Sequence, residues 1–210
     1  VSGFFLPDAY TPFEIAMGAT VLPQLDEIDP QKFLPSSRSI AFTKEAWRSV
    51  NGYPEWLDYC EDLVFDFALL KKYKSFAFAP EAVAYFHPRS SLRSYIQQYY
   101  QYARGDGKAD LWLKRHLIRY ATYLIGVPLI AWLSLQVSPL LGWLYLIGAI
   151  VYLMRPYQRL SSRLSELRSI DRFKAIAWIP MIRVVGDIAK MIGYPVGVLW
   201  RLSNSRNQTS

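Results

Sequence analysis

The 210-residue sequence contains a single cysteine, Cys60, so it cannot form an internal disulfide. The lack of disulfides suits a reducing compartment, which we expect for the soluble part of the chain. The sequence begins Val1-Ser2-Gly3, with no initiator Met and no signal-peptide pattern, and we expect it to be a piece of a longer protein. Acidic residues are few, with 17 Asp and Glu against 24 Lys and Arg. The net charge of +7 suits nucleic acid, an anionic membrane surface or a phosphate-bearing substrate.

Charge is almost absent from the middle of the sequence. Ile118–Val137 holds only Arg119, and Pro139–Met154 holds no charged residue. As helices these segments would extend about 30 Å and about 24 Å, against a hydrocarbon core of about 30 Å. Basic residues flank both outer ends: Lys114, Arg115 and Arg119 before the pair, and Arg155, Arg159 and Arg163 after it. The pattern predicts a transmembrane hairpin with both ends on the cytoplasmic side, and the alternative is a buried hairpin of a soluble protein.

The basic excess then has a simple explanation, because much of it flanks the hairpin and would meet the anionic leaflet. We therefore expect a lipid bilayer, and not nucleic acid, as the partner of these charges. The composition divides the chain into a mixed-polarity domain (1–115), the hairpin (116–156), a basic linker with an amphipathic helix (157–202) and a disordered tail (203–210).

Ala175–Trp200 is apolar but contains Arg183, Asp187 and Lys190 at spacings of four and three, which place them on one helical stripe. This pattern favours an interfacial amphipathic helix over a third membrane span. We expect Pro195, with the glycines on either side of it, to break the end of this helix.

The first 115 residues alternate short apolar runs with turn formers. Predicted strands lie near Gly3–Leu6 and at Ser39–Phe42, Phe76–Ala79 and Ala82–Phe86, and predicted helices at Pro12–Val21, Lys44–Val50 and Ser91–Arg104. A further buried helix is predicted to be capped by Asp58, with Glu61 completing a capping box. Gly105-Asp106-Gly107 is predicted to end the Ser91–Arg104 helix.

Four features of this part could carry chemistry. They are the pair Glu61-Asp62, His87 after a strand, the helical stripe Arg93/Gln97/Gln101/Arg104, and the run Ser36-Ser37-Arg38-Ser39. Each also has a structural interpretation: a helix cap, a satisfied histidine, the solvated face of a helix and a loop. Their residue types alone do not decide between these interpretations.

The order of these features resembles a known family. Six features follow one another along the chain. They are an apolar strand, the turn Asn51-Gly52-Tyr53-Pro54-Glu55, the pair Glu61-Asp62 on a buried helix, the run Phe76 to His87, a Gln-x-x-Arg-Gly helix and a membrane hairpin. This order resembles the C-terminal half of a membrane-bound family 2 glycosyltransferase with the Rossmann-like GT-A fold, in motif order over residues 1–110. The resemblance implies an α/β fold class, followed by the transmembrane hairpin and the amphipathic interfacial helix.

The resemblance also implies roles for individual residues. Asp62 matches the general base that deprotonates the acceptor hydroxyl in inverting transfer, and Glu61 would orient it or contact the acceptor. Gln101 and Arg104 match the first and fourth positions of the Gln-x-x-Arg-Trp motif, which grips the nucleotide-sugar pyrophosphate. Arg93 and Gln97 extend this stripe as further donor-binding candidates. His87 lies where some members place a metal ligand or phosphate contact.

Two departures from the family pattern matter. Gly105 replaces the Trp that stacks on the growing chain in processive synthases, which favours single-sugar transfer. No Asp-x-Asp metal motif occurs before Ser39, so the main ligands for Mg²⁺ or Mn²⁺ are expected in an N-terminal half that this sequence does not contain. We therefore expect the 210 residues alone to be inactive.

The resulting expectation is a hexosyltransferase-type enzyme of the cytoplasmic membrane, multi-pass, with its catalytic part on the cytoplasmic side. It would move a sugar from a nucleotide-sugar donor to a membrane-proximal, lipid-linked or saccharide acceptor in cell-envelope polysaccharide or glycolipid synthesis. The alternative is a non-catalytic membrane adaptor of a polysaccharide-assembly complex. A transporter is less compatible with only two convincing spans.

Overall fold

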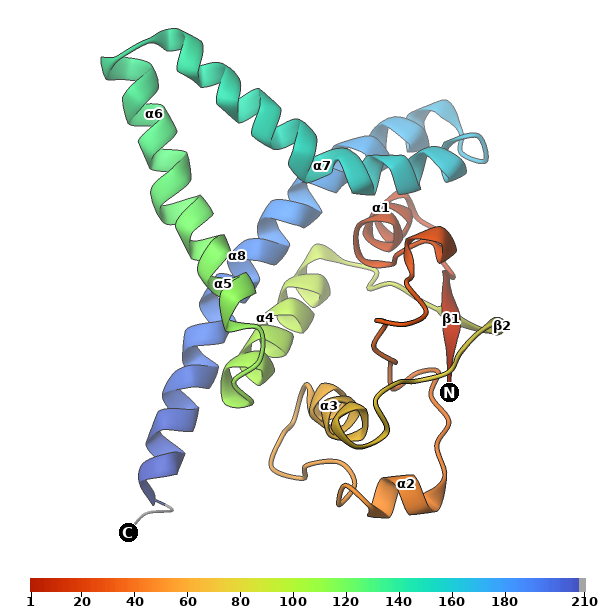
Figure 1. Ribbon diagram of the computed structural model, residues 1–210. Coiled ribbons are helices and arrows are strands. Elements are labelled where there is room, and N and C mark those ends of the chain that lie inside the picture. The colour runs from red at the N-terminus through yellow and green to blue at the C-terminus, as the bar shows by residue number, and fades with distance from the viewer. Residues whose placement is uncertain (208–210) are drawn as a thin grey trace.

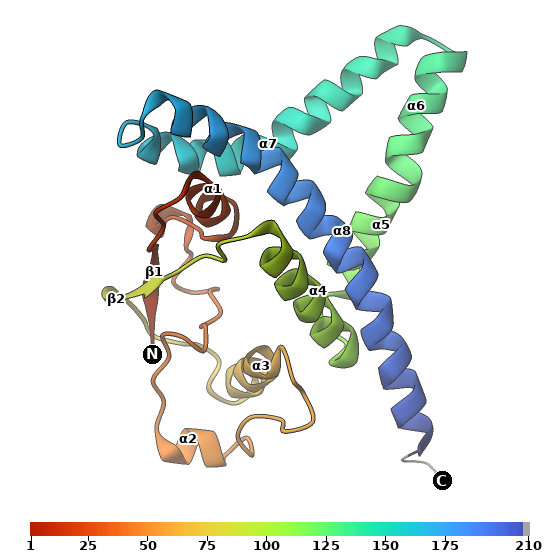
Figure 2. The ribbon, with the colours of Figure 1, turned by 180° about the vertical axis from the view of Figure 1, so that it is seen from behind.

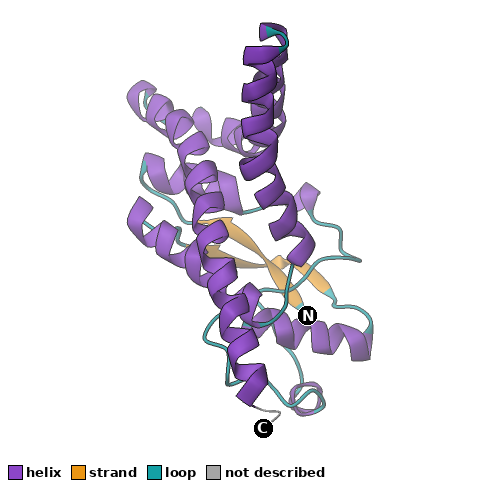
Figure 3. Cartoon of the chain, turned by 90° about the vertical axis from the view of Figure 1, so that its left-hand side faces the viewer, coloured by secondary structure: helices purple, strands orange, loops and turns teal. Residues whose placement is uncertain are grey.

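A computed structural model describes residues 1–207, which are mostly helical (66%) around one small sheet (Figures 1 and 3). In chain order the main elements are β1 (Ser2–Pro7), α1 (Pro12–Val21), α2 (Lys44–Arg48), α3 (Glu61–Tyr73), β2 (Phe78–Phe86), α4 (Leu92–Lys108), α5 (Leu113–Tyr120), a π-helical segment (Ala121–Gly126), α6 (Val127–Gln136), α7 (Trp143–Leu164) and α8 (Ser169–Asn207), with short 3₁₀ helices at Leu25–Glu27 and Pro139–Gly142. The structure thus shows helices with a two-stranded parallel sheet, which is the only part of the expected α/β class found among the described residues. That residues 1–115 form half of a GT-A domain remains a prediction.

The sheet joins two segments that are distant in sequence. β1 and β2 are parallel, and the register shifts between the pairs Ser2–Phe78 and Phe4–Val83. The shift lets β2 run unbroken through Pro80, where two separate strands were predicted, because a proline can sit at an irregularity without losing a ladder bond. Gly3 is required there, since a Cβ at this position would lie 1.9 Å from the Ala82 carbonyl oxygen.

The predicted strand Ser39–Phe42 is wrong, because only Ile40 forms a single antiparallel bridge, with Ser2. The chain turns away into α2 almost at once. Thr43 caps this helix, with its Oγ1 accepting a hydrogen bond from the Ala46 N–H at 3.1 Å. Because the helix cap at Thr43 follows directly after Phe42, few residues are left to pair as a strand.

The predicted helix Pro12–Val21 is confirmed at both ends. Thr11 accepts from the Glu14 N–H at 3.3 Å, and the Glu14 carboxylate accepts from the Thr11 N–H at 3.0 Å, which is a complete capping box. Pro12 fits the first turn because its position needs no N–H. These local signals explain why the sequence located the helix correctly.

The main helix packing joins α4 to α8, which cross closely in the view from behind (Figure 2). A Cβ added at Gly193 would lie 2.2 Å from the Tyr100 carbonyl oxygen, and one at Gly197 would lie 2.0 Å from that of Arg104. On α4, a Cβ at Gly107 would lie 2.3 Å from the Tyr194 carbonyl oxygen. The predicted breaks at these glycines are wrong, because small residues here let two helix backbones approach.

Both helices therefore continue beyond their predicted ends. α4 extends to Lys108, and α8 is continuous through Pro195 to Asn207. Residues 203–207, predicted to be part of a disordered tail, belong to α8, while residues 208–210 lie outside the described part of the chain. A core cluster unites these helices with α1 and α7: Phe13, Ile15, Ala16, Met17, Tyr95, Leu160, Ala175, Ile179 and Ile182.

The predicted hairpin is present as two helical stretches, Leu113–Gln136 and Pro139–Leu164, which are long and apolar enough to cross a membrane by length and composition. In Figure 1, α6 and the first part of α7 extend away from the sheet and α3, and the end of α7 returns to pack against α1. Side chains such as Leu124, Ile125 and Trp132 are exposed, so the hairpin is not buried within this chain. The structure thus favours membrane association for the hairpin, and its sidedness remains a prediction.

The polar stripe of α8 faces inward. Arg119 Nε donates to Asp187 Oδ1 at 2.8 Å, the Tyr152 hydroxyl donates to Asp187 Oδ2 at 2.6 Å, and the Arg183 guanidinium lies 4.2 Å from the centre of the Tyr152 ring. These contacts tie α8 to the base of the hairpin. The exposed face of α8 is instead apolar, and it includes Met181, Val184, Ile188, Ile192 and Leu199. The expected amphipathic helix is therefore present, with its charged side toward protein.

Candidate functional site

The pair Glu61-Asp62 opens α3, as predicted, but Asp58 does not cap this helix. Cys60 occupies the N-cap position in the left-handed region, with φ of 66° and no side-chain cap. Its thiol donates to the Tyr102 carbonyl oxygen at 3.2 Å and lies 3.4 Å from Asp106 Oδ1. Burial, with the nearby Asp106 carboxylate, raises the pKa of this thiol well above its usual range, so it remains a neutral donor. The start of α3 is thus attached to α4.

Asp58 binds two cations of α4 instead. Its carboxylate pairs with the Arg104 guanidinium and accepts from Lys108 Nζ at 2.7 Å. Burial raises the pKa of Asp58, while the hydrogen bond from Lys108 and the charges of both cations lower it, and the net change is a decrease. The capping prediction failed because these partners lie 46 and 50 residues away in sequence.

Gly105 has a packing role at this contact. A Cβ there would lie 2.6 Å from the Tyr59 carbonyl oxygen and 2.8 Å from Cys60 Sγ. Any larger residue would push the Tyr59-Cys60 turn, and with it the start of α3, away from α4. The position that carries Trp in the processive family pattern is therefore needed here for close packing.

A cavity of about 570 Å³ lies at the start of α3. Its walls come from residues 35–38, the turn into α3, and the helices α4, α5 and α8. Glu61 and Asp62 line it together with charged or titratable residues from the other walls, namely Arg38, Asp58, Asp106, Arg115, His116, Arg119 and Lys190. The acid pair and a group of cations from distant segments thus share one cavity.

A hydrogen-bonded chain crosses the α4–α5 side of this cavity. The buried His116 ring lies with Nε2 3.1 Å from Asp106 Oδ2, and Arg119 Nη1 lies 3.1 Å from its Nδ1. Because Arg119 can only donate, Nδ1 accepts, and the ring proton is on Nε2, where it is donated to Asp106. The His116 ring also stacks on Tyr194, with centroids 3.8 Å apart. These contacts fix α5 against α4 and α8.

The other predicted donor-binding residues on α4 lie outside the cavity lining. Arg104 holds Asp58 at the edge of the site, and Gln101 is partly buried with its Oε1 lacking a hydrogen-bond partner among the described residues. Arg93 and Gln97 are exposed further toward the start of α4. In the described part of the chain, Arg104 is linked to the cavity lining only through its ion pair with Asp58, and neither Arg93 nor Gln97 contacts the lining through an ion pair.

His87 lies at the end of β2, among residues that do not line this cavity. Its Nδ1 is 2.8 Å from the Asp8 carbonyl oxygen, and its Nε2 is 3.8 Å from Glu14 Oε1. No group of three or more His, Cys, Asp or Glu side chains within the described residues is arranged to hold a metal ion. The described residues therefore do not fit Mg²⁺ or Mn²⁺ by themselves.

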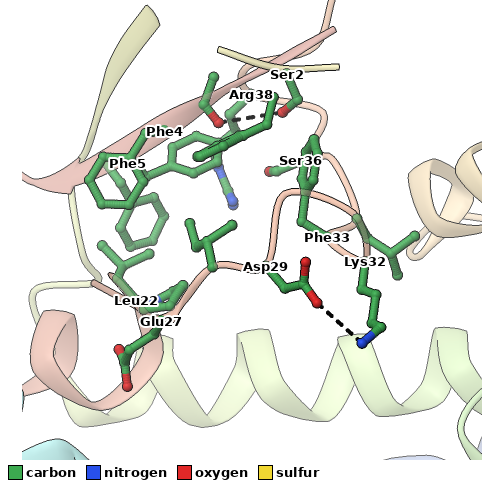
Figure 4. A pocket seen from close by; sticks show the side chains of 16 residues that line it. Ser2, Phe4, Phe5, Leu22, Glu27, Asp29, Lys32, Phe33, Ser36 and Arg38 are labelled. Atoms are coloured by element: carbon green, nitrogen blue, oxygen red, sulfur yellow. Dashed lines mark hydrogen bonds and ion pairs between the residues drawn. The ribbon is translucent and has the colours of Figure 1, made fainter. Parts of the chain in front are cut away.

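A second cavity, of about 500 Å³, lies under β1 (Figure 4). Aromatic side chains such as Phe4, Phe5 and Phe33 line it, with the ion pair Asp29–Lys32 at its edge. Arg38 lines both cavities, and its Nη2 donates to the Tyr102 hydroxyl at 3.3 Å. Lacking a comparable pair of adjacent acids, this apolar cavity is the weaker candidate for acid–base chemistry.

Several residues of the main cavity were not singled out as site candidates from the sequence. Arg115 and Arg119 were interpreted only as membrane-flanking charges, and Lys190 only as part of a polar stripe. The i, i+4 spacing of Arg115 and Arg119 on α5 was a usable signal, because it places both guanidinium groups on one face of the helix. The pairing of His116 with Asp106 had no comparable signal in the sequence.

Asp66, one turn beyond Asp62 on α3, is 1% exposed, and its Oδ2 has no hydrogen-bond partner among the described residues. Burial, with the Asp62 carboxylate, raises its pKa to about 7. The folded chain thus keeps this proton to higher pH than the unfolded chain, whose Asp pKa is about 3.9. The contribution of Asp66 to stability is complete below pH ~3.9 and is lost as pH rises through about 7.

We expect Asp66→Asn to raise the free energy of unfolding at pH 8 by about 1–3 kcal/mol, because it removes a buried unpaired charge. At pH 4 the variant and the parent chain should melt at nearly the same temperature. Thermal melts in detergent from pH 4 to pH 8 measure this difference. Glu55→Gln, at an exposed acid, is the control and should show no such pH dependence. Equal pH profiles for Asp66→Asn and the parent chain would contradict the buried, protonated state.

Comparisons with protein-family models, with curated proteins and with solved structures find no match to this chain. The geometry of the cavity and the motif resemblance are therefore the two indications of function that this chain offers.

Proposed function

We propose that this chain is the base-bearing part of an inverting, membrane-bound glycosyltransferase of the family 2 type. The supporting observation is that Glu61 and Asp62 open into the 570 Å³ cavity, whose wall includes α5. α5 is the start of the stretch Leu113–Gln136, the first of the two candidate spans. A carboxylate in a cavity beside a membrane helix is well placed for an acceptor that stays at the membrane.

In the proposed reaction Asp62 removes the proton from an acceptor hydroxyl. The hydroxyl oxygen then attacks the anomeric carbon of the sugar from the face opposite the nucleoside diphosphate, which leaves as the new bond forms. Asp62 Oδ1 accepts from the Leu63 N–H at 2.9 Å, which orients the carboxylate within the first turn of α3. Glu61 would hold the acceptor beside it.

The test is sugar transfer by membranes that contain this chain together with the upstream segment implied by the resemblance. Radiolabelled nucleotide sugars are supplied one at a time, and NMR of the product gives the anomeric configuration. We expect transfer with inversion from at least one donor and no turnover by the 210 residues alone. Retention of configuration, or no transfer from any donor, would contradict the proposal.

A further inference from the structure

The charged groups that line the main cavity divide into paired and unpaired sets. Asp58 is held by Arg104 and Lys108, Asp106 by His116, and Arg119 by Asp187. The remaining charged side chains of the lining form no ion pair within 4 Å among the described residues, and they are Arg38, Glu61, Asp62, Arg115 and Lys190. The cavity therefore contains free cations in addition to the free acid pair.

Lys190 is the most deeply placed of the three free cations, since Arg38 and Arg115 are exposed. Its ammonium lies 4.7 Å from the centre of the Tyr99 ring and has no hydrogen-bond acceptor among the described residues. Burial lowers its pKa to about 8, although the Asp187 carboxylate acts in the opposite direction. This partly buried ammonium lines the cavity, so an anion there could accept a charge-assisted hydrogen bond from it.

Arg115 contributes a second cation from α5. Its guanidinium lies 3.9 Å from the centre of the Trp112 ring, and this stacking leaves the N–H edge of the group available. A planar fork of N–H donors and an ammonium that line one cavity suit phosphate oxygens, which accept several hydrogen bonds at once.

The helices that carry these two cations are apolar on their exposed sides. α5 directs Arg115 and Arg119 to the cavity and exposes Leu113, Leu117 and Ile118. α8 directs Lys190 to the cavity and exposes the aliphatic face described above. With these faces in a bilayer, the cations would lie at the depth of lipid headgroups.

We infer that Lys190 and Arg115 bind the phosphate of a membrane lipid whose headgroup also carries the hydroxyl that Asp62 deprotonates. This inference rests on the proposed glycosyl transfer and names its acceptor as a hydroxyl-bearing phospholipid or phosphate-linked glycolipid. The phosphate remains unchanged in the reaction. The headgroup O–H gives its proton to Asp62, its oxygen bonds to the anomeric carbon, and the nucleoside diphosphate leaves with the electron pair of the broken bond.

Binding is tested without any sugar donor, so that its result is independent of transfer. The full chain in dodecyl maltoside micelles is titrated with dioleoylphosphatidylglycerol, with dioleoylglycerol, which lacks phosphate, and with UDP, and bound ligand is counted by native mass spectrometry. We expect binding of the phospholipid, little binding of dioleoylglycerol, and no displacement of the phospholipid by UDP. Lys190→Gln and Arg115→Gln should each weaken phospholipid binding by about tenfold or more.

Lys174→Gln on the same helix removes the same charge far from the cavity lining, from an exposed Lys beside Asp171, and should change binding less than twofold. Arg115, which is exposed, keeps the test valid if Lys190→Gln fails to fold. If Lys174→Gln weakens phospholipid binding as much as the cavity variants do, the effect comes from the overall charge and the inference is overturned. Displacement of the phospholipid by UDP would assign the cations to the donor and also overturn it. If the phospholipid binds as expected but Asp62→Asn leaves transfer unchanged, the proposed base fails and the phosphate site stands.

Discussion

Asp62→Asn is expected to lower the rate of sugar transfer by about 10²–10⁴-fold, the usual contribution of a general base. The amide cannot take the proton from the acceptor, although it has nearly the shape of the carboxylate. Its oxygen can still accept the hydrogen bond from the Leu63 N–H, so the first turn of α3 should keep its structure. The loss should therefore appear in kcat, measured as initial rates with the complete membrane protein, while binding of the nucleotide sugar persists.

The control for this variant is Asp26→Asn, an exposed carboxylate that does not line the main cavity. It should transfer sugar at the parent rate. Glu61→Gln should raise KM for the acceptor more than it lowers kcat, because Glu61 is proposed to hold the acceptor and not to take its proton. An Asp62→Asn variant that retains activity within threefold of the parent would remove Asp62 from the role of base.

Local signals explain which parts of the fold the sequence predicted. The bounds of α1 follow from Thr11, Pro12 and Glu14, which lie within one turn of each other and satisfy the first backbone N–H groups themselves. The helical stripe of Arg183 and Asp187 on α8 follows from spacing within one helix. Each of these features could be predicted from residues a few positions apart in the sequence.

The site was only partly predictable, because its other half comes from distant segments. Asp58 lies close enough to α3 to look like a cap, yet its carboxylate is taken by Arg104 and Lys108. Lys190 looked like one charge of a surface stripe, and only the packing of α8 on α4 brings it to the cavity that contains Asp62. Sequence spacing finds partners within a helix, whereas these pairings depend on tertiary structure.

The glycines of α4 and α8 led to helix ends being predicted where the structure has none, again because tertiary packing is not visible in the sequence. Glycine is the poorest helix former after proline, so Gly105, Gly193 and Gly197 each predicted the end of a helix. The loss of intrinsic helix propensity is offset by close backbone packing, which a single sequence does not reveal. The largest structural effect is therefore expected at the tightest of the α4–α8 contacts.

Gly197→Ala is expected to destabilise the chain by about 3 kcal/mol, or roughly 6–12 °C in Tm. The new Cβ would lie 2.0 Å from the Arg104 carbonyl oxygen and 2.8 Å from the Lys108 backbone nitrogen. Both atoms belong to a helix backbone and cannot rotate away as a side chain could, so the two helices must separate. Thermal melts in detergent measure the shift.

Gly148→Ala is the matched control, because it makes the same change in α7, where a Cβ would meet no atom within 4 Å. It should leave Tm unchanged or raise it slightly, since alanine favours a helix by about 1 kcal/mol over glycine. The two variants together separate loss of packing from gain of helix propensity. Equal Tm values for both would show that α4 and α8 are not held at backbone contact. Because α4 carries Asp106 and α8 carries Lys190, separation of the helices should also weaken phospholipid binding in the cavity.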